Sequence, residues 1–279
     1  KDIGAGLTRL TVRQARCLRA LRPKVRIVVS VGDAYPLLLA GVFARRPILC
    51  LSTAKSEYIR GHLGIELWLM KRLAGMILAR DENTAKALSD RGVQAKFLGN
   101  VMMDGFSITG ENFGLMLDRK VVGILPGSRK EAYRNMVKIL HVVERLAAMN
   151  GNGTDFVVGL APSLRLEPLA QAARHAGWRF GPGTERDLDS GVVGRLRPSA
   201  ADEPCVIVTQ GKFGDVLNLS SVVIGLSGTG NEQAAGLGRP VVSFPTEGPQ
   251  FNAKFARAQK RLLGDAVALV ESGEAEAVA

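Results

Sequence analysis

Residues 221–244 restrict the fold of this chain more than any other segment. An apolar run at 221–226 predicts a buried strand, and the small-residue sequence Ser227-Gly228-Thr229-Gly230 follows it. Residues 234–238 then predict a short helix with a glycine stop, and a second apolar run follows at 240–244. A strand, a turn, a helix and a strand in so little sequence predict two parallel strands joined by a helix, which is the repeating unit of α/β proteins.

The turn at 227–230 also indicates a ligand. The first N–H groups of a helix lack intrahelical partners and sit at the positive end of its dipole, so such a turn binds phosphate well. Glu232 falls in the first turn of this helix. A carboxylate is unsuited to phosphate but suited to the two hydroxyls of a ribose, so the pattern favours a nucleotide. The alternative is a carboxylate placed there only by the helix dipole.

The same alternation extends along the chain. Apolar runs at 25–31, 47–51, 76–79 and 95–98 are separated by helical segments, and a second set begins at 121–125. Residues 180–201 are rich in Gly, Pro and charge and predict irregular structure or an excursion from this alternation. We therefore expect two Rossmann-like α/β domains facing a cleft, at 1–104 and 120–279, with a linker at 105–119.

A second strand–helix turn reads Gly127-Ser128-Arg129. Its N–H groups and the guanidinium fork of Arg129 suit a diphosphate, although a solvated arginine is an equal alternative. Gln250 and Asn252 open a later helix and are candidates for phosphate or sugar contacts or for helix capping.

Asp33 follows the strand at 25–31, at the strand end where open α/β sheets bind ligands. A carboxylate there can be a general base, or simply a helix N-cap.

The composition limits the kinds of partner that we expect this chain to bind. The net charge of +11 suits an anionic partner, but aromatic residues make up only 5% of the chain and none alternates with basic residues, so we expect no nucleic acid. Three scattered Cys and three scattered His predict no metal site, and we expect no cofactor. No apolar stretch is long enough to span a membrane. The expected basic stripe of Arg9, Arg13, Arg16 and Arg19 is a solvated helix face or a membrane-surface contact.

Several motifs together resemble one known group. ILPGSRKE at 124–131, VIGLSGTGNEQAAGLGRPVVSF at 223–244 and GPQFNAKFARAQKRLLG at 248–264 are similar to the C-terminal domain of the lipid-A-disaccharide-synthase-related proteins, of the GT-B glycosyltransferase superfamily. VGDAYPLLLAG at 31–41 and the segment at 80–105 extend the similarity over most of the chain. The Glu of SGTGNE stands one residue earlier than in the synthase pattern SGT-A-x-x-E.

The resemblance implies a metal-independent, inverting hexosyltransferase. It would move a sugar from a nucleotide diphosphate, in this group UDP, to a lipid-linked or other hydrophobic acceptor, as in lipid A biosynthesis. It implies that Arg129, the turn at 227–230, Glu232 and Gln250 contact UDP and that Asp33 deprotonates the acceptor. The site expected is Gly127, Ser128, Arg129, Ser227, Gly228, Thr229, Gly230, Glu232, Gln250 and Asn252, with Asp33 as the catalytic residue.

Two alternatives stay open. A UDP-sugar epimerase on the same fold would bind the same nucleotide and need no acceptor, and a protein that has lost catalysis would only bind the sugar nucleotide or lipid. The motif order lacks the first strand and glycine loop of the N-terminal domain, so we expect that domain to be incomplete. We expect a cytoplasmic location, peripheral on the inner face of the membrane.

Overall fold

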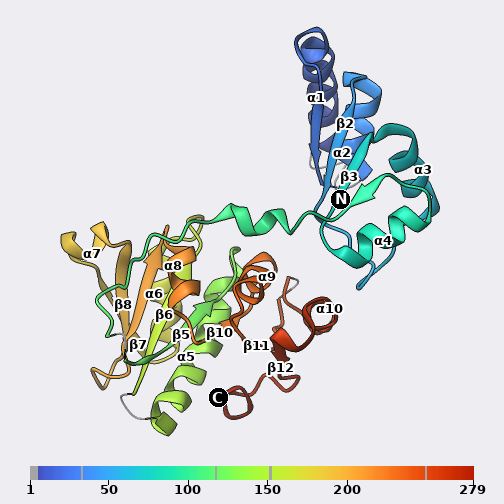
Figure 1. The fold of residues 1–279 in the computed structure, drawn as a ribbon. Coiled ribbons are helices and arrows are strands. Elements are labelled where there is room, and N and C mark those ends of the chain that lie inside the picture. The colour runs from blue at the N-terminus through green and yellow to red at the C-terminus, as the bar shows by residue number, and fades with distance from the viewer. Residues whose placement is uncertain (1–5, 33, 117, 151–152, 249) are drawn as a thin grey trace. The chain divides into compact units, whose positions relative to one another are not determined.

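The computed structural model describes residues 6–32, 34–116, 118–150, 153–248 and 250–279. The chain divides into two compact units, Lys1–Val101 and Met102–Ala279 (Figure 1). Each unit has its own sheet. Among the described residues, no helix is both long and apolar enough to cross a bilayer.

The first unit is a parallel sheet of four strands in the order β1-β2-β3-β4. This arrangement confirms the α/β class for the N-terminal half. The strands are β1 (Val28–Val31), β2 (Ile48–Ser52), β3 (Met76–Ala79) and β4 (Ala95–Lys96). The helices are α1 (Leu7–Leu21), η1 (Arg22–Lys24), α2 (Ala34–Leu39), η2 (Ala40–Ala44), α3 (Gly64–Leu73) and α4 (Glu82–Asp90).

One face of this small sheet is packed by helices. Leu37 of α2, Met70 of α3 and Leu88 of α4 meet Ile48, Cys50 and Ile77 of the strands in one buried cluster. Strand β2 alternates in burial, so one of its faces enters the core while the other does not. Helix α1 packs beside η2, where the Arg19 guanidinium lies 4.9 Å from the centre of the Phe43 ring.

An ion network fixes the loop from β2 to α3. Lys55 Nζ donates to both oxygens of Glu66, at 2.6 and 2.5 Å, and Glu66 accepts the backbone N–H of Leu63 at 2.8 Å. Burial raises the pKa of Glu66, but these bonds outweigh it and hold that pKa below its usual value. The network therefore sets the position at which α3 begins.

The second unit contains an eight-stranded sheet in the order β12-β11-β10-β5-β6-β9-β8-β7. The strands are β5 (Lys120–Leu125), β6 (Thr154–Leu160), β7 (Trp178–Pro182), β8 (Val192–Pro198), β9 (Val206–Gln210), β10 (Val222–Gly225), β11 (Val241–Ser243) and β12 (Val267–Leu269). The helices are η3 (Val101–Gly105), α5 (Glu131–Asn150), α6 (Leu166–His175), α7 (Glu185–Asp189), α8 (Phe213–Leu219), α9 (Thr229–Gly236), α10 (Ala253–Leu263), η5 (Gly264–Ala266) and α11 (Ala275–Val278).

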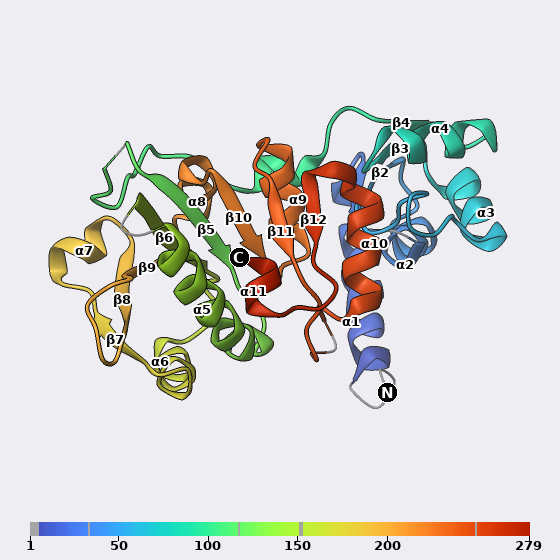
Figure 2. The ribbon, with the colours of Figure 1, turned by 90° about the horizontal axis from the view of Figure 1, so that it is seen from below.

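Helices cover both faces of this sheet (Figure 2). On one face α5, α6, α10 and α11 pack on alternate side chains of the strands, such as Val122 and Phe156. On the other face α8 and α9 cover the intervening side chains, such as Leu125 and Val223. Strands buried on both sides explain why β5, β6 and β9 read as continuous apolar runs.

Residues 180–201 form the predicted excursion from the parallel alternation, and they are regular, not irregular. These residues form the end of β7, helix α7 and strand β8, and the two strands pair antiparallel at the sheet edge. Arg195 of β8 donates to both oxygens of Asp187 in α7, at 2.9 and 2.7 Å. Bonds from Arg195 and Thr184 hold the pKa of Asp187 well below its usual value. The glycines and charges that suggested a loop serve this hairpin and its ion pair.

The segment at 105–119, which the sequence predicts as a linker, packs on the second unit. Asp215 of α8 is 1% exposed and accepts the backbone N–H groups of Thr109 and Gly110, at 2.6 and 2.8 Å. It also accepts the Thr109 hydroxyl at 2.8 Å. The Asp215 carboxylate thus ties the segment at 105–119 to α8 of the second unit.

Candidate functional site

The order of the strands creates a crevice at the carboxyl ends of β5 and β10 in the larger sheet. From β5 the chain runs through β6 to the edge strand β7, comes back through β8 to β9 beside β6, and then crosses to the other side of β5 to form β10, β11 and β12. β5 and β10 are therefore neighbours whose following helices, α5 and α9, lie on opposite faces of the sheet. Open α/β sheets bind ligands at such a switch point, beyond the carboxyl ends of the strands.

The loop after β5 forms one wall of this crevice. Gly127 has a φ of 110°, and a Cβ atom there would lie 3.2 Å from the carbonyl oxygen of Leu226, so glycine lets the two loops approach. Buried Asn135 of α5 donates to the Pro126 carbonyl at 2.9 Å, and Ser163 donates to the Ser128 carbonyl at 3.0 Å. The loop is therefore held at both ends.

The turn after β10 forms the other wall. Gly228 is the N-cap of α9, and the Ser227 hydroxyl accepts the Gly230 N–H at 3.3 Å. Asn231, wholly buried, donates to the Gly225 carbonyl at 2.9 Å. Its side chain lies where a Cβ on Gly225 would be 2.1 Å away, so this position requires glycine.

Gln259 of α10 fastens this turn from behind. Its Nε2 donates to the carbonyls of Ser227 and Gly228, at 3.2 and 2.9 Å, and its Oε1 accepts Asn231 Nδ2 at 2.8 Å. Gln259 is 3% exposed, so these bonds are shielded from water. With the carbonyls turned back toward Gln259, the start of α9 is free to present its N–H groups to the crevice.

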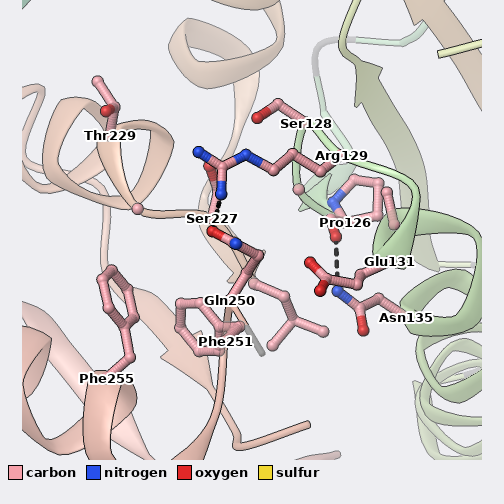
Figure 3. A pocket seen from close by; sticks show the side chains of 14 residues that line it. Pro126, Ser128, Arg129, Glu131, Asn135, Ser227, Thr229, Gln250, Phe251 and Phe255 are labelled. Carbon is pink, nitrogen blue, oxygen red and sulfur yellow. Dashed lines mark hydrogen bonds between the residues drawn. The ribbon is translucent and has the colours of Figure 1, made fainter. Parts of the chain in front are cut away.

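A cavity of about 280 Å³ lies between the two walls (Figure 3). Arg129 and Gln250 point toward one another across it, and Arg129 Nη1 donates to Gln250 Oε1. This bond leaves the other guanidinium N–H groups and the Gln250 amide N–H groups as donors. Phe251 and Phe255 close one side, with ring centres 5.4 Å apart.

A larger cavity of about 570 Å³ adjoins the first, because Gly127, Ser128, Ser227 and Thr229 line both. Its walls come from the carboxyl ends of β5, β6 and β9 and from the segment tied down by Asp215. Phe106 and Phe213 meet edge to face on this side, with ring centres 5.7 Å apart. The pair of cavities therefore joins a polar, cationic part to a more apolar one.

The structure brings most of the predicted site together. The first cavity is lined by Gly127, Ser128, Arg129, Ser227, Gly228, Thr229 and Gln250, and Gly230 lines the second. Asn252 lines neither, and its side chain caps α10 by accepting the Phe255 N–H at 3.0 Å. Asp33 lies outside the described residues.

Glu232 lies in the first turn of α9 but lines neither cavity. The next residue, Gln233, lines the larger cavity, and its Nε2 donates to the Met102 carbonyl at 2.6 Å. In the related pattern SGT-A-x-x-E the Glu stands at the position of Gln233. The one-residue departure of SGTGNE from that pattern was the signal for this difference. The ribose contact predicted for Glu232 stays a prediction, and Gln233 is a second candidate for it.

Sequence reasoning also missed the acidic and aromatic lining. Glu131 lines the first cavity, two residues beyond Arg129. Its carboxylate can accept hydrogen bonds from sugar hydroxyls, whereas the N–H groups that bind phosphate can only donate them.

Among the described residues, no three His, Cys, Asp or Glu side chains gather closely enough to hold a metal ion.

Comparisons with known proteins identify the fold. No family model and no curated protein sequence matches the chain. A Listeria monocytogenes structure, provisionally described as a UDP-N-acetylglucosamine 2-epimerase, matches with a TM-score of 0.61 and 16% identity over 98% of this chain and 69% of its own. The UDP-GlcNAc 2-epimerase of Methanocaldococcus jannaschii matches with a TM-score of 0.58 and 14% identity, over 96% of this chain and 72% of its own.

The UDP-GlcNAc 2-epimerase of Neisseria meningitidis, solved with UDP-GlcNAc bound, matches with a TM-score of 0.56 and 17% identity over 98% of this chain and 71% of its own. At such identities the likeness establishes the fold alone. It confirms the GT-B-like α/β class with Rossmann-type units. It does not single out the lipid-A-disaccharide-synthase-related proteins within that superfamily.

Proposed function

We propose that the paired cavities bind a nucleotide sugar through its diphosphate, and that the chain is a UDP-sugar epimerase. The observation that carries the first part is the meeting of two glycine turns with Arg129 at the switch point of a parallel sheet. Backbone N–H groups, the start of α9 and a guanidinium fork are the donors that a diphosphate requires.

Chemistry divides the ligand between the two cavities. The smaller cavity offers the cationic and N–H donors, so it takes the phosphates. Glu131, which lines the same smaller cavity, and Gln233 in the larger one offer acceptors and an amide, which suit hydroxyl groups. Donors fixed in advance also stabilise charge that develops on the diphosphate if its bond to the sugar breaks.

The proposal of epimerisation draws support from the structures named above, which are of UDP-N-acetylglucosamine 2-epimerases. A glycosyltransferase is the second candidate. It is favoured by the motifs GSR at 127–129 and GPQF at 248–251, which resemble the lipid-A-disaccharide-synthase-related proteins. In that case a metal-independent, inverting transfer to a lipid-linked acceptor would need a base, and Asp33 is the candidate from the sequence.

The two candidates differ in their need for an acceptor. We would incubate the full chain with UDP-GlcNAc in deuterated water and follow the sugar by NMR. An epimerase forms the C2 epimer without any acceptor and places solvent deuterium at the inverted carbon, because that C–H bond must break and re-form.

Three results separate the readings. Appearance of the epimer, lost in Arg129→Ala, supports the proposal. Unchanged sugar nucleotide that is consumed only when a lipid acceptor is added contradicts epimerisation and favours transfer. Tight binding of UDP-GlcNAc with no turnover in either arm indicates a binding protein.

A further inference from the structure

The two units differ completely in charge. Residues 1–101 contain 18 Lys and Arg against 7 Asp and Glu, whereas residues 102–279 contain 19 of each. The entire net charge of +11 therefore belongs to the first unit. The proposed nucleotide site lies in the neutral unit, so its ligand does not account for this excess.

Exposed apolar side chains follow the same division. Among the described residues, 17 of the 22 large apolar side chains that are exposed belong to the first unit, although it is the smaller one. Soluble proteins rarely gather such side chains without a partner for them. A surface that is both cationic and apolar indicates a partner that is both anionic and apolar.

Helix α3 concentrates the apolar part. Ile65 and Trp68 are 62% and 58% exposed, and Leu63 just before the helix is 49% exposed. Residues 65, 68 and 72 share one side of a helix, while Met70 on the other side is 1% exposed and packs in the core. The one carboxylate of the helix, Glu66, is bound to Lys55, whereas Lys71 and Arg72 in its last turn and Arg60 before it are exposed.

We propose that this outer face of α3 (Leu63, Ile65 and Trp68, with Arg60, Lys71 and Arg72) docks on an anionic lipid bilayer. Tryptophan and aliphatic side chains beside Lys and Arg are the composition of helices that lie in a membrane interface. The remaining charge of the unit, including the α1 residues Arg9, Arg13 and Arg16, attracts an anionic surface over a longer range.

The other apolar row of this unit suits a bilayer less well. Val29 and Val31 lie on β1, an edge strand of the sheet, and Ile27 directly precedes it. A strand edge presents backbone N–H and C=O groups that hydrocarbon cannot satisfy, whereas the backbone groups of a helix bond internally. This contrast places the lipid contact on α3.

The two tryptophans allow a direct test. Trp178 is wholly buried in the second unit, so Trp178→Phe leaves Trp68 as the only tryptophan in the chain. We would add vesicles of phosphatidylcholine with phosphatidylglycerol, or of phosphatidylcholine alone, without any nucleotide. We expect a blue shift of Trp68 emission, and quenching by spin-labelled lipid, with the anionic vesicles and a much smaller change with neutral ones.

Co-sedimentation of the otherwise native chain gives a second readout. The double variant Ile65→Ser/Trp68→Ser should bind anionic vesicles at least about tenfold more weakly, because it removes two apolar side chains from the contact. The matched control is Leu188→Ser on α7, which removes a similarly exposed side chain from the neutral unit and should bind like wild type.

Other outcomes would overturn the proposal. Unchanged Trp68 emission with anionic vesicles, or equal binding of the double variant and wild type, would show that α3 does not enter the bilayer. Self-association of the wild type that the double variant lacks, without vesicle binding, would make a second copy the partner. Capture of an acidic protein with no vesicle binding would assign the face to that protein. Because no nucleotide is present, these results are independent of the proposed enzymatic function.

Discussion

Gln259 offers a sharp test of how the turn at 227–230 is held. It does not face either cavity, yet its side chain makes three buried hydrogen bonds, two of them to the carbonyls of Ser227 and Gly228. Gln259→Leu keeps the approximate volume and removes all three. We therefore expect a loss of both stability and ligand affinity from a residue that contacts no ligand.

The size of each effect follows from the bonds. Three buried hydrogen bonds at about 1 kcal/mol each give a loss of about 3 kcal/mol in the free energy of unfolding. For a unit of this size, that loss lowers the melting temperature by roughly 6–12 °C. Two backbone residues of the turn would also need to be ordered on binding, at about 1 kcal/mol or more each, so UDP should bind at least about tenfold more weakly.

The assay combines thermal unfolding with titration calorimetry at a temperature where the variant is fully folded. Gln171→Leu is the matched control, since Gln171 is exposed on α6 and the chemical change is the same. The control should stay within about 0.5 kcal/mol of wild type. A destabilised Gln259→Leu that binds UDP normally would refute the link between these bonds and the turn, and an unchanged melting temperature would refute the bonds themselves.

Three further predictions concern other parts of the second unit. Arg129→Lys keeps the charge but loses the planar fork, so UDP should bind about tenfold more weakly while uridine binding is unchanged, as measured by calorimetry. Glu232→Ala should weaken UDP binding at least about tenfold if Glu232 accepts the ribose hydroxyls, because two charge-assisted bonds are lost; an effect seen only in Gln233→Ala would move that role to Gln233. Asp187→Asn should reduce stability at neutral pH by roughly 1–2 kcal/mol. The pKa of Asp187 is depressed in the folded state, so the stability that it contributes is present above the unfolded pKa of about 3.9 and is lost as pH falls further. In urea unfolding, the free energies of unfolding of the wild type and the variant should therefore converge below about pH 4. A difference that stays constant with pH would be contrary to the ion-pair account.

Local patterns were sufficient to predict the fold class and the two strand–helix turns that line the first cavity. Buried parallel strands are read as continuous apolar runs, which is why β5 and β10 were predicted close to their observed bounds. Gly127 stood out because few other residues suit its positive φ between strand and helix. These signals depend on neighbours in sequence, so one chain is enough to find them.

The features that were missed depend on distant contacts. In the hairpin of β7 and β8, half-buried Asp187 and Arg195 form an ion pair, and neither charge signals a strand by itself. Gln259 lies 31 residues from Gly228, and only the packing of α10 on α9 brings them together. The side chain that turns into the larger cavity, Gln233 rather than Glu232, is set by the exact start of α9.

The central claim is that the turns after β5 and β10 recognise a diphosphate. Titration of the full chain with UDP and with uridine tests it most directly, because the two ligands differ only in the phosphates. We expect UDP to bind at least about 100-fold more tightly than uridine, a difference of about 2.7 kcal/mol, and Arg129→Ala to remove most of that difference. Equal affinity for the two ligands, or a preference for UDP that survives Arg129→Ala unchanged, would contradict the account.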